Sequence, residues 1–297
     1  MADLNLSGLG VALITPFKKD FSIDFESLNN VIEHVIKGGC DYIVALGTTA
    51  ETPTLSFSER VEIATQIKRT VNNRIPLVIG IGGNCTARVI ENINNFNLEG
   101  FSAILSVTPF YNKPSQEGLF KHYEAIVKAS PIPLILYNVP GRTGINLSAE
   151  TTIRLSKFSN KIYGLKDASG CLEQSEKILK ATPNDFLLIS GDDASVVPLM
   201  EKGAKGVISV VANAYPKVMK QMVDLCNSGK YNEANKKQDE LLPFINLLFK
   251  EGNPSGVKAV LKHLGLIENN LRLPLVTVSS ELEQKLCLES EKILGNS

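Results

Sequence analysis

The sequence predicts an α/β fold, a (β/α)8 TIM barrel followed by a C-terminal helical appendage. Short runs rich in apolar residues alternate with amphipathic, helix-like stretches along most of the chain. The short runs are apolar on both faces, which is typical of parallel strands that are covered by helices. Eight such repeats over about 220 residues fall within the usual size range of a closed barrel.

The expected elements follow one another in the order that a barrel requires. The strands are expected at residues 10–14, 42–46, 77–81, 103–107, 134–137, 162–166, 186–190 and 206–210. The helices between them are expected at residues 25–37, 59–71, 87–97, 118–128, 149–157, 172–180 and 194–202. Asp24, Ser56 and Ser148 are capping residues that support three of the helix starts. Gly38 and Gly39 are suited to a left-handed cap at the end of the first helix.

The pattern changes at about residue 231, where the strands stop. Three helices are expected at residues 231–250, 255–264 and 279–294, with residues 271–275 as a linker between the last two. We therefore expect two domains, a catalytic barrel over residues 1–230 and a three-helix domain over residues 231–297.

An open, doubly wound sheet is the competing architecture. Residues 80–84 (GIGGN) superficially resemble a dinucleotide-binding loop. The third glycine of that motif is not at the required spacing, and no acidic residue ends a following strand in the expected place. The sequence therefore favours the barrel and gives no support for a nucleotide cofactor.

Composition excludes several classes of function. The chain of 297 residues has 31 basic and 31 acidic residues, so no net charge attracts nucleic acid or an anionic membrane. Its five cysteines lack CxxC spacing and its three histidines lie far apart, which indicates reduced thiols and no metal site. The N-terminus lacks the layout of a signal peptide, and no apolar run approaches the roughly 20 residues of a membrane helix. We expect a soluble, cytoplasmic protein.

Chemically active side chains follow the ends of the expected strands. In a barrel these positions meet at the carboxyl-terminal mouth, where active sites lie. Taken singly, each side chain has an ordinary interpretation as a turn residue, a rim aromatic or a surface charge. Together they predict an active site. The residues are Thr48, Thr49, Glu51, Asn84, Tyr111, Tyr137, Arg142, Lys166, Asp192 and Asp193.

Lys166 is the most informative of these residues. It lies at the end of the expected strand 162–166, whereas lysine usually occupies solvated surfaces. An amine carried into such a site favours the neutral form, which is the nucleophile that makes Schiff bases. Tyrosine hydroxyls nearby are suited to moving protons. No cluster of aspartates or histidines follows the strands, which disfavours metal-assisted aldol chemistry.

Three segments at this mouth resemble motifs of the dihydrodipicolinate synthase family, which lies within the N-acetylneuraminate lyase-like class I aldolases. Residues 46–52 (LGTTAET) resemble its GTTGES motif, residues 137–143 (YNVPGRT) its YNVP(G/S)RT motif, and residues 164–170 (GLKDASG) its lysine motif. Further matching segments lie at residues 107–114, 190–193, 206–210 and 253–254. The lysine motif is shared with N-acetylneuraminate lyase and keto-deoxy sugar-acid aldolases. A sister aldolase and a catalytically silent barrel therefore stay open as alternatives.

The resemblance implies a lyase of diaminopimelate and lysine biosynthesis that works without a cofactor. It implies condensation of pyruvate with L-aspartate-β-semialdehyde to give 4-hydroxy-tetrahydrodipicolinate. By this likeness Lys166 forms the imine with pyruvate, and Tyr137 donates and accepts protons beside it. Thr49 links Tyr137 to Tyr111 in a hydroxyl relay. Tyr111 is implied to cross into the neighbouring subunit's site of a homotetramer, arranged as a dimer of dimers.

The same resemblance implies how the two substrates are held. Thr48 and Thr49 would bind the pyruvate carboxylate, helped by backbone groups near Gly191 and Ile208. Arg142 would bind the carboxylate of the semialdehyde, a task for which a bidentate guanidinium is suited.

The threonine segment departs from the family motif at two positions, where Ala50 and Thr52 replace glycine and serine. Thr52 keeps the hydroxyl group. Ala50 matters only where the backbone needs a positive φ.

A second departure concerns regulation, because lysine-inhibited bacterial relatives bind lysine in a pocket at a subunit interface. Arg88 replaces a glutamate of that pocket, Phe57 a histidine and Phe110 a tyrosine, so a bound lysine would meet repulsion and lose hydrogen bonds. The positions that align with the pocket are Thr52, Pro53, Phe57, Asn84, Arg88 and Phe110. We expect weak inhibition by lysine or none.

Overall fold

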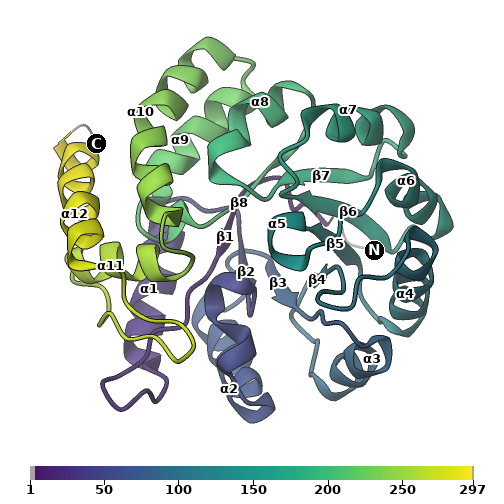
Figure 1. Cartoon of the computed structure of the whole chain (residues 1–297), viewed down its shortest axis with the longest axis horizontal. Helices are drawn as coiled ribbons and strands as arrows, with labels where there is room; N and C mark the ends of the chain where they lie inside the picture. Colours follow the sequence, from purple (N-terminus) through teal and green to yellow (C-terminus); the bar gives the residue numbers. More distant parts are fainter. Residues whose placement is uncertain (1–3, 296–297) are drawn as a thin grey trace.

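The predicted barrel is confirmed by the computed structural model, which describes residues 4–295. Eight parallel strands close in chain order, with β1 pairing both β2 and β8 (Figure 1). The strands are β1 (Gly8–Ala12), β2 (Tyr42–Ala45), β3 (Leu77–Gly80), β4 (Ala103–Val107), β5 (Leu134–Asn138), β6 (Ile162–Asp167), β7 (Leu187–Ser190) and β8 (Gly206–Ser209). The first three residues, used above for the signal-peptide prediction, and the last two lie outside the described part.

Helices surround the strands, as the amphipathic stretches predict (Figure 1). The barrel helices are α1 (Phe25–Lys37), α2 (Phe57–Val71), α3 (Thr86–Asn95), α4 (Gln116–Ala129), α6 (Ala149–Phe158), α7 (Leu172–Ala181), α8 (Val196–Glu201) and α9 (Pro216–Asn227), with a short α5 (Pro140–Thr143) after β5. Helix α9 is missing from the sequence-based prediction. Its first residue, Pro216, is typical of a helix start because it has no N–H to leave unpaired.

Capping chemistry explains where several helices begin and end. Asp24, Ser56 and Ser148 each accept a hydrogen bond from a backbone N–H in the first turn of the helix that follows. Ser56 forms a capping box with Glu59, so α2 begins at Phe57 and not at the expected Glu59. At the end of α1 the left-handed residue is Gly39, with φ 88°.

The glycine-rich segment that begins at the last residue of β3 allows neighbouring backbones to pack closely. A Cβ on Gly80 would lie 2.2 Å from the carbonyl oxygen of Leu46, and one on Gly82 would lie 2.8 Å from the backbone nitrogen of Val107. Glycine is therefore needed here because neighbouring backbones approach closely. This contact accounts for the GIGGN segment without a nucleotide.

Two hydrophobic clusters hold the barrel together. One fills the barrel interior and includes Leu6, Tyr42, Val78, Ile135 and Ile189, all fully buried. The other lies between the strands and the surrounding helices and continues into the C-terminal helices. The interior cluster closes the barrel below its carboxyl-terminal mouth, so the strand ends form the floor of a cavity and not the wall of a pore.

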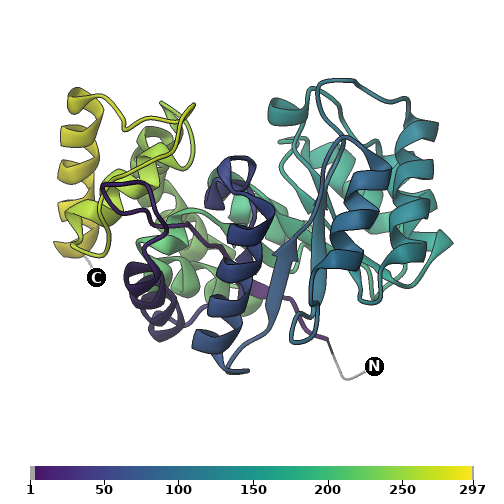
Figure 2. The same cartoon turned by 90° about the horizontal axis from the view of Figure 1, so that it is seen from below.

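Three helices follow the barrel, as predicted: α10 (Tyr231–Phe249), α11 (Ser255–His263) and α12 (Ser280–Gly295). Helix α10 contacts α8 and α9, and α12 contacts α10 and α11. Figures 1 and 2 show α11 and α12 at one side of the barrel, outside the ring of helices. Their apolar residues belong to the same cluster as the barrel helices. A domain boundary at residue 230 stays a prediction.

No helix within residues 4–295 is long and apolar enough to span a membrane.

Candidate active site

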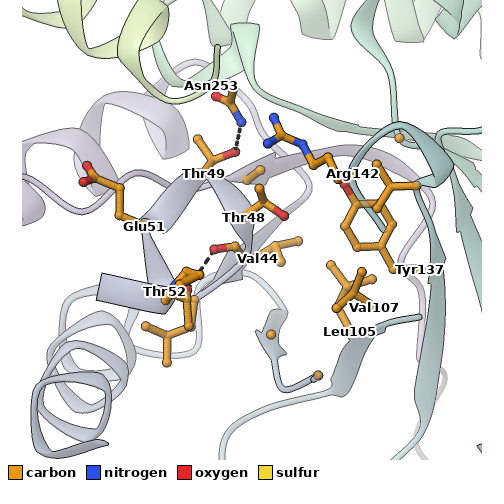
Figure 3. Close-up of a pocket in the computed structure, with 18 of the residues that line it drawn as sticks. Val44, Thr48, Thr49, Glu51, Thr52, Leu105, Val107, Tyr137, Arg142 and Asn253 are labelled. Carbon is orange, nitrogen blue, oxygen red and sulfur yellow. Dashed lines mark hydrogen bonds between the residues drawn. The ribbon is translucent and has the colours of Figure 1, made fainter. Parts of the chain in front are cut away.

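A cavity of about 670 Å³ lies at the carboxyl-terminal mouth of the barrel, where the sequence places the site. It is lined by residues that follow all strands from β2 to β8, together with Ala12 of β1 and residues of the C-terminal region (Figure 3). The predicted residues among its lining are Thr48, Thr49, Glu51, Thr52, Pro53, Phe110, Tyr137, Arg142, Lys166, Gly191 and Asp192. Neighbouring parallel strands thus bring together side chains that are distant in the sequence.

Lys166 and Tyr137 are paired by the register of the sheet. β5 and β6 place Tyr137 directly beside Lys166, and the lysine nitrogen lies 4.3 Å from the centre of the tyrosine ring. Both side chains are buried, at 6% and 7% exposure. Within residues 4–295 no carboxylate forms an ion pair with Lys166. The neighbouring Asp167 accepts hydrogen bonds from Asn138 and other polar groups. Lys166 is itself among the residues that line the cavity.

Gly191 provides space for the stem of Lys166. A Cβ at this position would lie 2.9 Å from the Cβ of Ala168 and 3.1 Å from the Cε of Lys166. Contacts this short occur rarely, so a side chain here would displace the lysine or its neighbour. The sequence indicates Gly191 only as a backbone group near the substrate, whereas the structure adds a steric reason for glycine.

The segment between β2 and α2 folds as two 3-10 turns, Thr48–Ala50 and Thr52–Thr54. Glu51 lies between them in the left-handed region, with φ 55°. Ala50 is absent from the positive-φ residues, so the replacement of the family glycine introduces no backbone strain. The Thr52 hydroxyl donates to the carbonyl of Gly47 over 2.8 Å and stabilises the turn.

The side chains of Thr48 and Thr49 point from this turn toward different neighbours. Figure 3 shows Thr48 on the side of Arg142 and Tyr137, whereas Thr49 points to Asn253. Thr49 is 2% exposed, and its hydroxyl accepts a hydrogen bond of 3.0 Å from the Asn253 amide. Asn253 lines the same cavity and follows α10. It is a site residue that the sequence indicates only through the matched segment 253–254.

A buried ion pair lies behind the threonine turn. Lys258 on α11 contacts the Glu51 carboxylate, and both side chains are fully buried. Burial lowers the pKa of Lys258 to about 8, although the nearby Glu51 charge acts in the opposite direction. The sequence places Glu51 at the barrel rim but gives it no partner. A lysine inside the otherwise apolar run around Val257 and Ala259 is the signal that points to a buried partner.

Asp193 after β7 holds the backbone after β8. Its carboxylate accepts hydrogen bonds from the N–H groups of Val210 and Val211, at 2.9 and 3.2 Å. Burial raises its pKa to about 6 despite these hydrogen bonds. Because Val210 lines the cavity, this carboxylate shapes the wall of the site.

Some predicted residues lie apart from the cavity. Tyr111 is 85% exposed, has φ 71° and is not among the lining residues. Ile208 is buried in the barrel interior and is also outside the lining. In the described part of the chain no hydrogen bond joins Tyr137 to Thr49 or Tyr111, so the hydroxyl relay stays a prediction.

The positions aligned with the lysine pocket form no single pocket within this chain. Thr52, Pro53 and Phe110 line the active-site cavity, and the Asn84 amide donates to the carbonyl of Phe110 over 3.3 Å. The remaining two point elsewhere. Phe57 packs on Phe96 with 5.0 Å between ring centres, and the largely exposed Arg88 pairs with Glu91 at 3.6 Å.

Residues 4–295 contain no group of three or more histidine, cysteine, aspartate or glutamate side chains that could hold a metal ion. The reactive groups that the cavity does offer are an amine, a phenol, hydroxyls and a guanidinium. Together with the closed barrel, they define a class of (β/α)8 enzymes whose site at the strand ends is built around a lysine.

Comparison with known proteins specifies the family. The chain belongs to the Dihydrodipicolinate synthetase family, whose profile matches residues 5–291. It is 50% identical over 276 residues to the 4-hydroxy-tetrahydrodipicolinate synthase of Parabacteroides distasonis, covering 93% of each chain.

Solved structures agree with this membership. One is the dihydrodipicolinate synthase of Acinetobacter baumannii complexed with pyruvate, with a TM-score of 0.94, 40% identity and coverage of 98% of this chain and 99% of that one. Another is the synthase of Cyanidioschyzon merolae with lysine bound, with a TM-score of 0.92, 37% identity and coverage of 95% and 96%.

Proposed function

We propose that this chain condenses pyruvate with L-aspartate-β-semialdehyde to 4-hydroxy-tetrahydrodipicolinate, through a Schiff base at Lys166. The enzyme is a lyase of the diaminopimelate and lysine pathway, in line with the names of its relatives. The observation that carries the assignment of the lysine is its position. Lys166 is the buried amine at the end of β6, beside the ring of Tyr137 and inside the cavity.

The proposed reaction begins at the keto group of pyruvate. The Lys166 amine attacks the keto carbon of pyruvate, and water leaves as the imine forms. Loss of a methyl proton turns the imine into an enamine, whose carbon attacks the aldehyde of the semialdehyde. The resulting alkoxide takes up a proton. The amine of the semialdehyde then adds to the imine carbon, and this step closes the ring and releases Lys166.

Tyr137 is the proposed proton carrier in these steps, because its ring lies against the reacting amine. Thr48 and Thr49 are proposed to bind the pyruvate carboxylate, with backbone groups near Gly191. Figure 3 shows Arg142 near Thr48, with Tyr137 beside it. We assign it the semialdehyde carboxylate, which a guanidinium binds through two parallel hydrogen bonds. The backbone near Ile208 is kept as part of the proposed pyruvate site.

We also propose a homotetramer built as a dimer of dimers, in which Tyr111 enters the site of a neighbouring copy. Two features support this proposal. Tyr111 is an exposed aromatic held in a left-handed conformation, and Phe110 beside it is 40% exposed. Exposed aromatic neighbours of this kind are typical of protein interfaces. A cytoplasmic location stays a prediction.

One measurement separates this function from that of a sister aldolase. Purified protein is supplied with pyruvate and L-aspartate-β-semialdehyde, and product is followed by mass spectrometry. N-acetylneuraminate cleavage is assayed in parallel. We expect condensation product and no cleavage. Cleavage in the absence of condensation would assign the chain to a sister activity, and the absence of both would favour a silent barrel.

A further inference from the structure

We propose that the buried Glu51–Lys258 ion pair positions the turn that carries Thr48 and Thr49, and so sets the affinity of the site for the pyruvate carboxylate. The inference rests on the proposed function, since it concerns the same pyruvate site. Glu51 and Lys258 are positioning residues, which act on the substrate through the threonines. The neighbouring Asn253 holds the same turn through its hydrogen bond to Thr49.

The first argument comes from the shape of the turn. Glu51 is the left-handed residue between two 3-10 turns, a conformation that is uncommon for a residue with a side chain. Figure 3 shows its carboxylate leaving the turn on the side away from Tyr137. The orientation of Glu51 therefore fixes the direction in which Thr48 and Thr49 enter the cavity.

The second argument is that both carboxylate oxygens of Glu51 are held by the C-terminal region. One oxygen contacts the Lys258 ammonium, and the other accepts a hydrogen bond of 3.1 Å from the backbone N–H of Arg272. Lys258 in turn donates to the carbonyl of Asn270 over 2.9 Å and lies 4.3 Å from the ring centre of Phe17. The pair is thus anchored from several directions and has one arrangement.

Further contacts fix the ends of the same turn. Asn253 donates directly to Thr49, and the Arg272 guanidinium donates to the carbonyl of Thr54 over 3.1 Å. Arg272 also pairs with Glu59 on the first turn of α2. The threonine turn is therefore supported at its beginning, middle and end by residues from beyond α10.

The third argument is energetic. A fully buried ion pair generally gives no more stability than apolar side chains of similar volume, because two charges have lost their hydration. What the pair does provide is one defined geometry, since a misplaced charge would be left buried without a partner. A pair directly behind the carboxylate-binding threonines is placed to define that geometry.

The test compares variants by borohydride trapping of the pyruvate imine. In Glu51→Gln the side chain keeps its size and an acceptor for Arg272 but loses its charge. We expect the pyruvate concentration for half-maximal trapping to rise about tenfold, as for the loss of roughly one good hydrogen bond to the carboxylate. The KM for semialdehyde should stay within about twofold. Lys262→Met is the control for breaking an ion pair of α11. Lys262 lies on the same helix as Lys258, but it pairs with Glu283 at the surface.

A double variant separates positioning from stability. Glu51→Gln combined with Lys258→Met removes both charges and leaves none unpaired, so the Tm should return toward the wild-type value. The raised half-saturation for pyruvate should remain. Recovery of pyruvate affinity together with the Tm would show that the pair is only structural and would overturn the proposal.

Asn253→Ala tests the same turn without creating a buried charge, and it serves where the charge variants fail to fold. A raised half-saturation for pyruvate is again expected. The positioning role alone would be overturned if the wild type traps pyruvate normally and the folded variants need the same pyruvate concentration for half-maximal trapping. A wild-type protein that forms no reduced adduct would overturn the proposed function itself.

Discussion

At the scale of single residues, the proposed chemistry depends on one amine held against one phenol. β6 carries Lys166 to the cavity, the β5–β6 register sets Tyr137 beside it, and the missing side chain of Gly191 leaves room for the lysine stem. Lys166 and Tyr137 are both buried beside the cavity. These relations predict the effects of individual substitutions.

Lys166→Ala should remove the imine. Borohydride with pyruvate is expected to add a reduced three-carbon group to the Lys166 peptide of the wild type and to no peptide of the variant. The condensation rate should fall on the order of a thousandfold or more, because the covalent route is lost. Lys157→Ala is the control, since Lys157 is exposed on α6. Undiminished labelling of the Lys166→Ala protein would contradict the assignment.

Arg142→Ala should impair use of the semialdehyde more than use of pyruvate. Arg142 is exposed at the cavity, so the lost carboxylate contact is worth about 2 kcal/mol, or roughly thirtyfold in kcat/KM for the semialdehyde. Pyruvate trapping should stay near the wild-type value. Arg142→Lys keeps the charge but loses the bidentate geometry, and we expect an intermediate result. An equal loss for both substrates would make Arg142 a structural residue of the α5 loop.

At the scale of elements, α3 and α4 are joined by a buried histidine. His122 on α4 is 5% exposed, and its Nδ1 lies 2.9 Å from the hydroxyl of Thr86, the first residue of α3. The other ring nitrogen has no partner in the structure. Burial lowers the pKa of His122 from 6.5 to about 4, so the folded protein holds a neutral ring.

This histidine predicts a pH dependence of stability. Between pH 6.5 and pH 4 the unfolded chain binds a proton at His122 and the folded protein does not. The contribution of the neutral His122 ring to the free energy of unfolding is therefore complete above pH 6.5. It is lost as the pH falls toward 4, by up to roughly 3 kcal/mol. Urea unfolding of wild type and His122→Asn across this range should show the difference narrowing as the pH falls. A constant difference would contradict the prediction.

Asp193 affects the pH dependence of stability with the opposite sign to His122. For this reason the wild type is compared with His122→Asn and is not measured alone. Its pKa is raised from 3.8 to about 6 in the folded protein. The folded state therefore binds more protons at this site between these values, and this contribution to stability grows as the pH falls. The two groups partly cancel in the wild type.

At the scale of the whole molecule, the sequence predicts the barrel because strands and helices repeat locally. It also predicts most of the site, because parallel strands place their ends at one mouth. The roles of Asn253 and Lys258 cannot be predicted from the local sequence pattern, because each contacts a partner more than 200 residues away in the chain. Helix α9 is also missing from the prediction, because Pro216 marks its start without a capping side chain.

The response to lysine is a second prediction at this scale. We expect no more than weak inhibition by lysine at millimolar concentrations, because Arg88 and Phe57 have partners of their own and offer none to an ammonium. Steady-state rates with and without lysine test this. The synthase of Cyanidioschyzon merolae, solved with lysine bound, is the positive control for binding. Strong inhibition would show that other residues have rebuilt the pocket.

The contacts that support the threonine turn have a consequence for how the protein is made. The turn leaves the ribosome early, whereas Asn253, Lys258 and Arg272 are among the later residues to be synthesised. Domains generally fold as they emerge, and contacts between distant residues form late. A nascent chain that has emerged as far as β8 holds all eight strands and Lys166, but it lacks the three residues that hold the threonine turn. We therefore expect the threonine turn to reach its final geometry only after the segment from Asn253 to Arg272 has been synthesised.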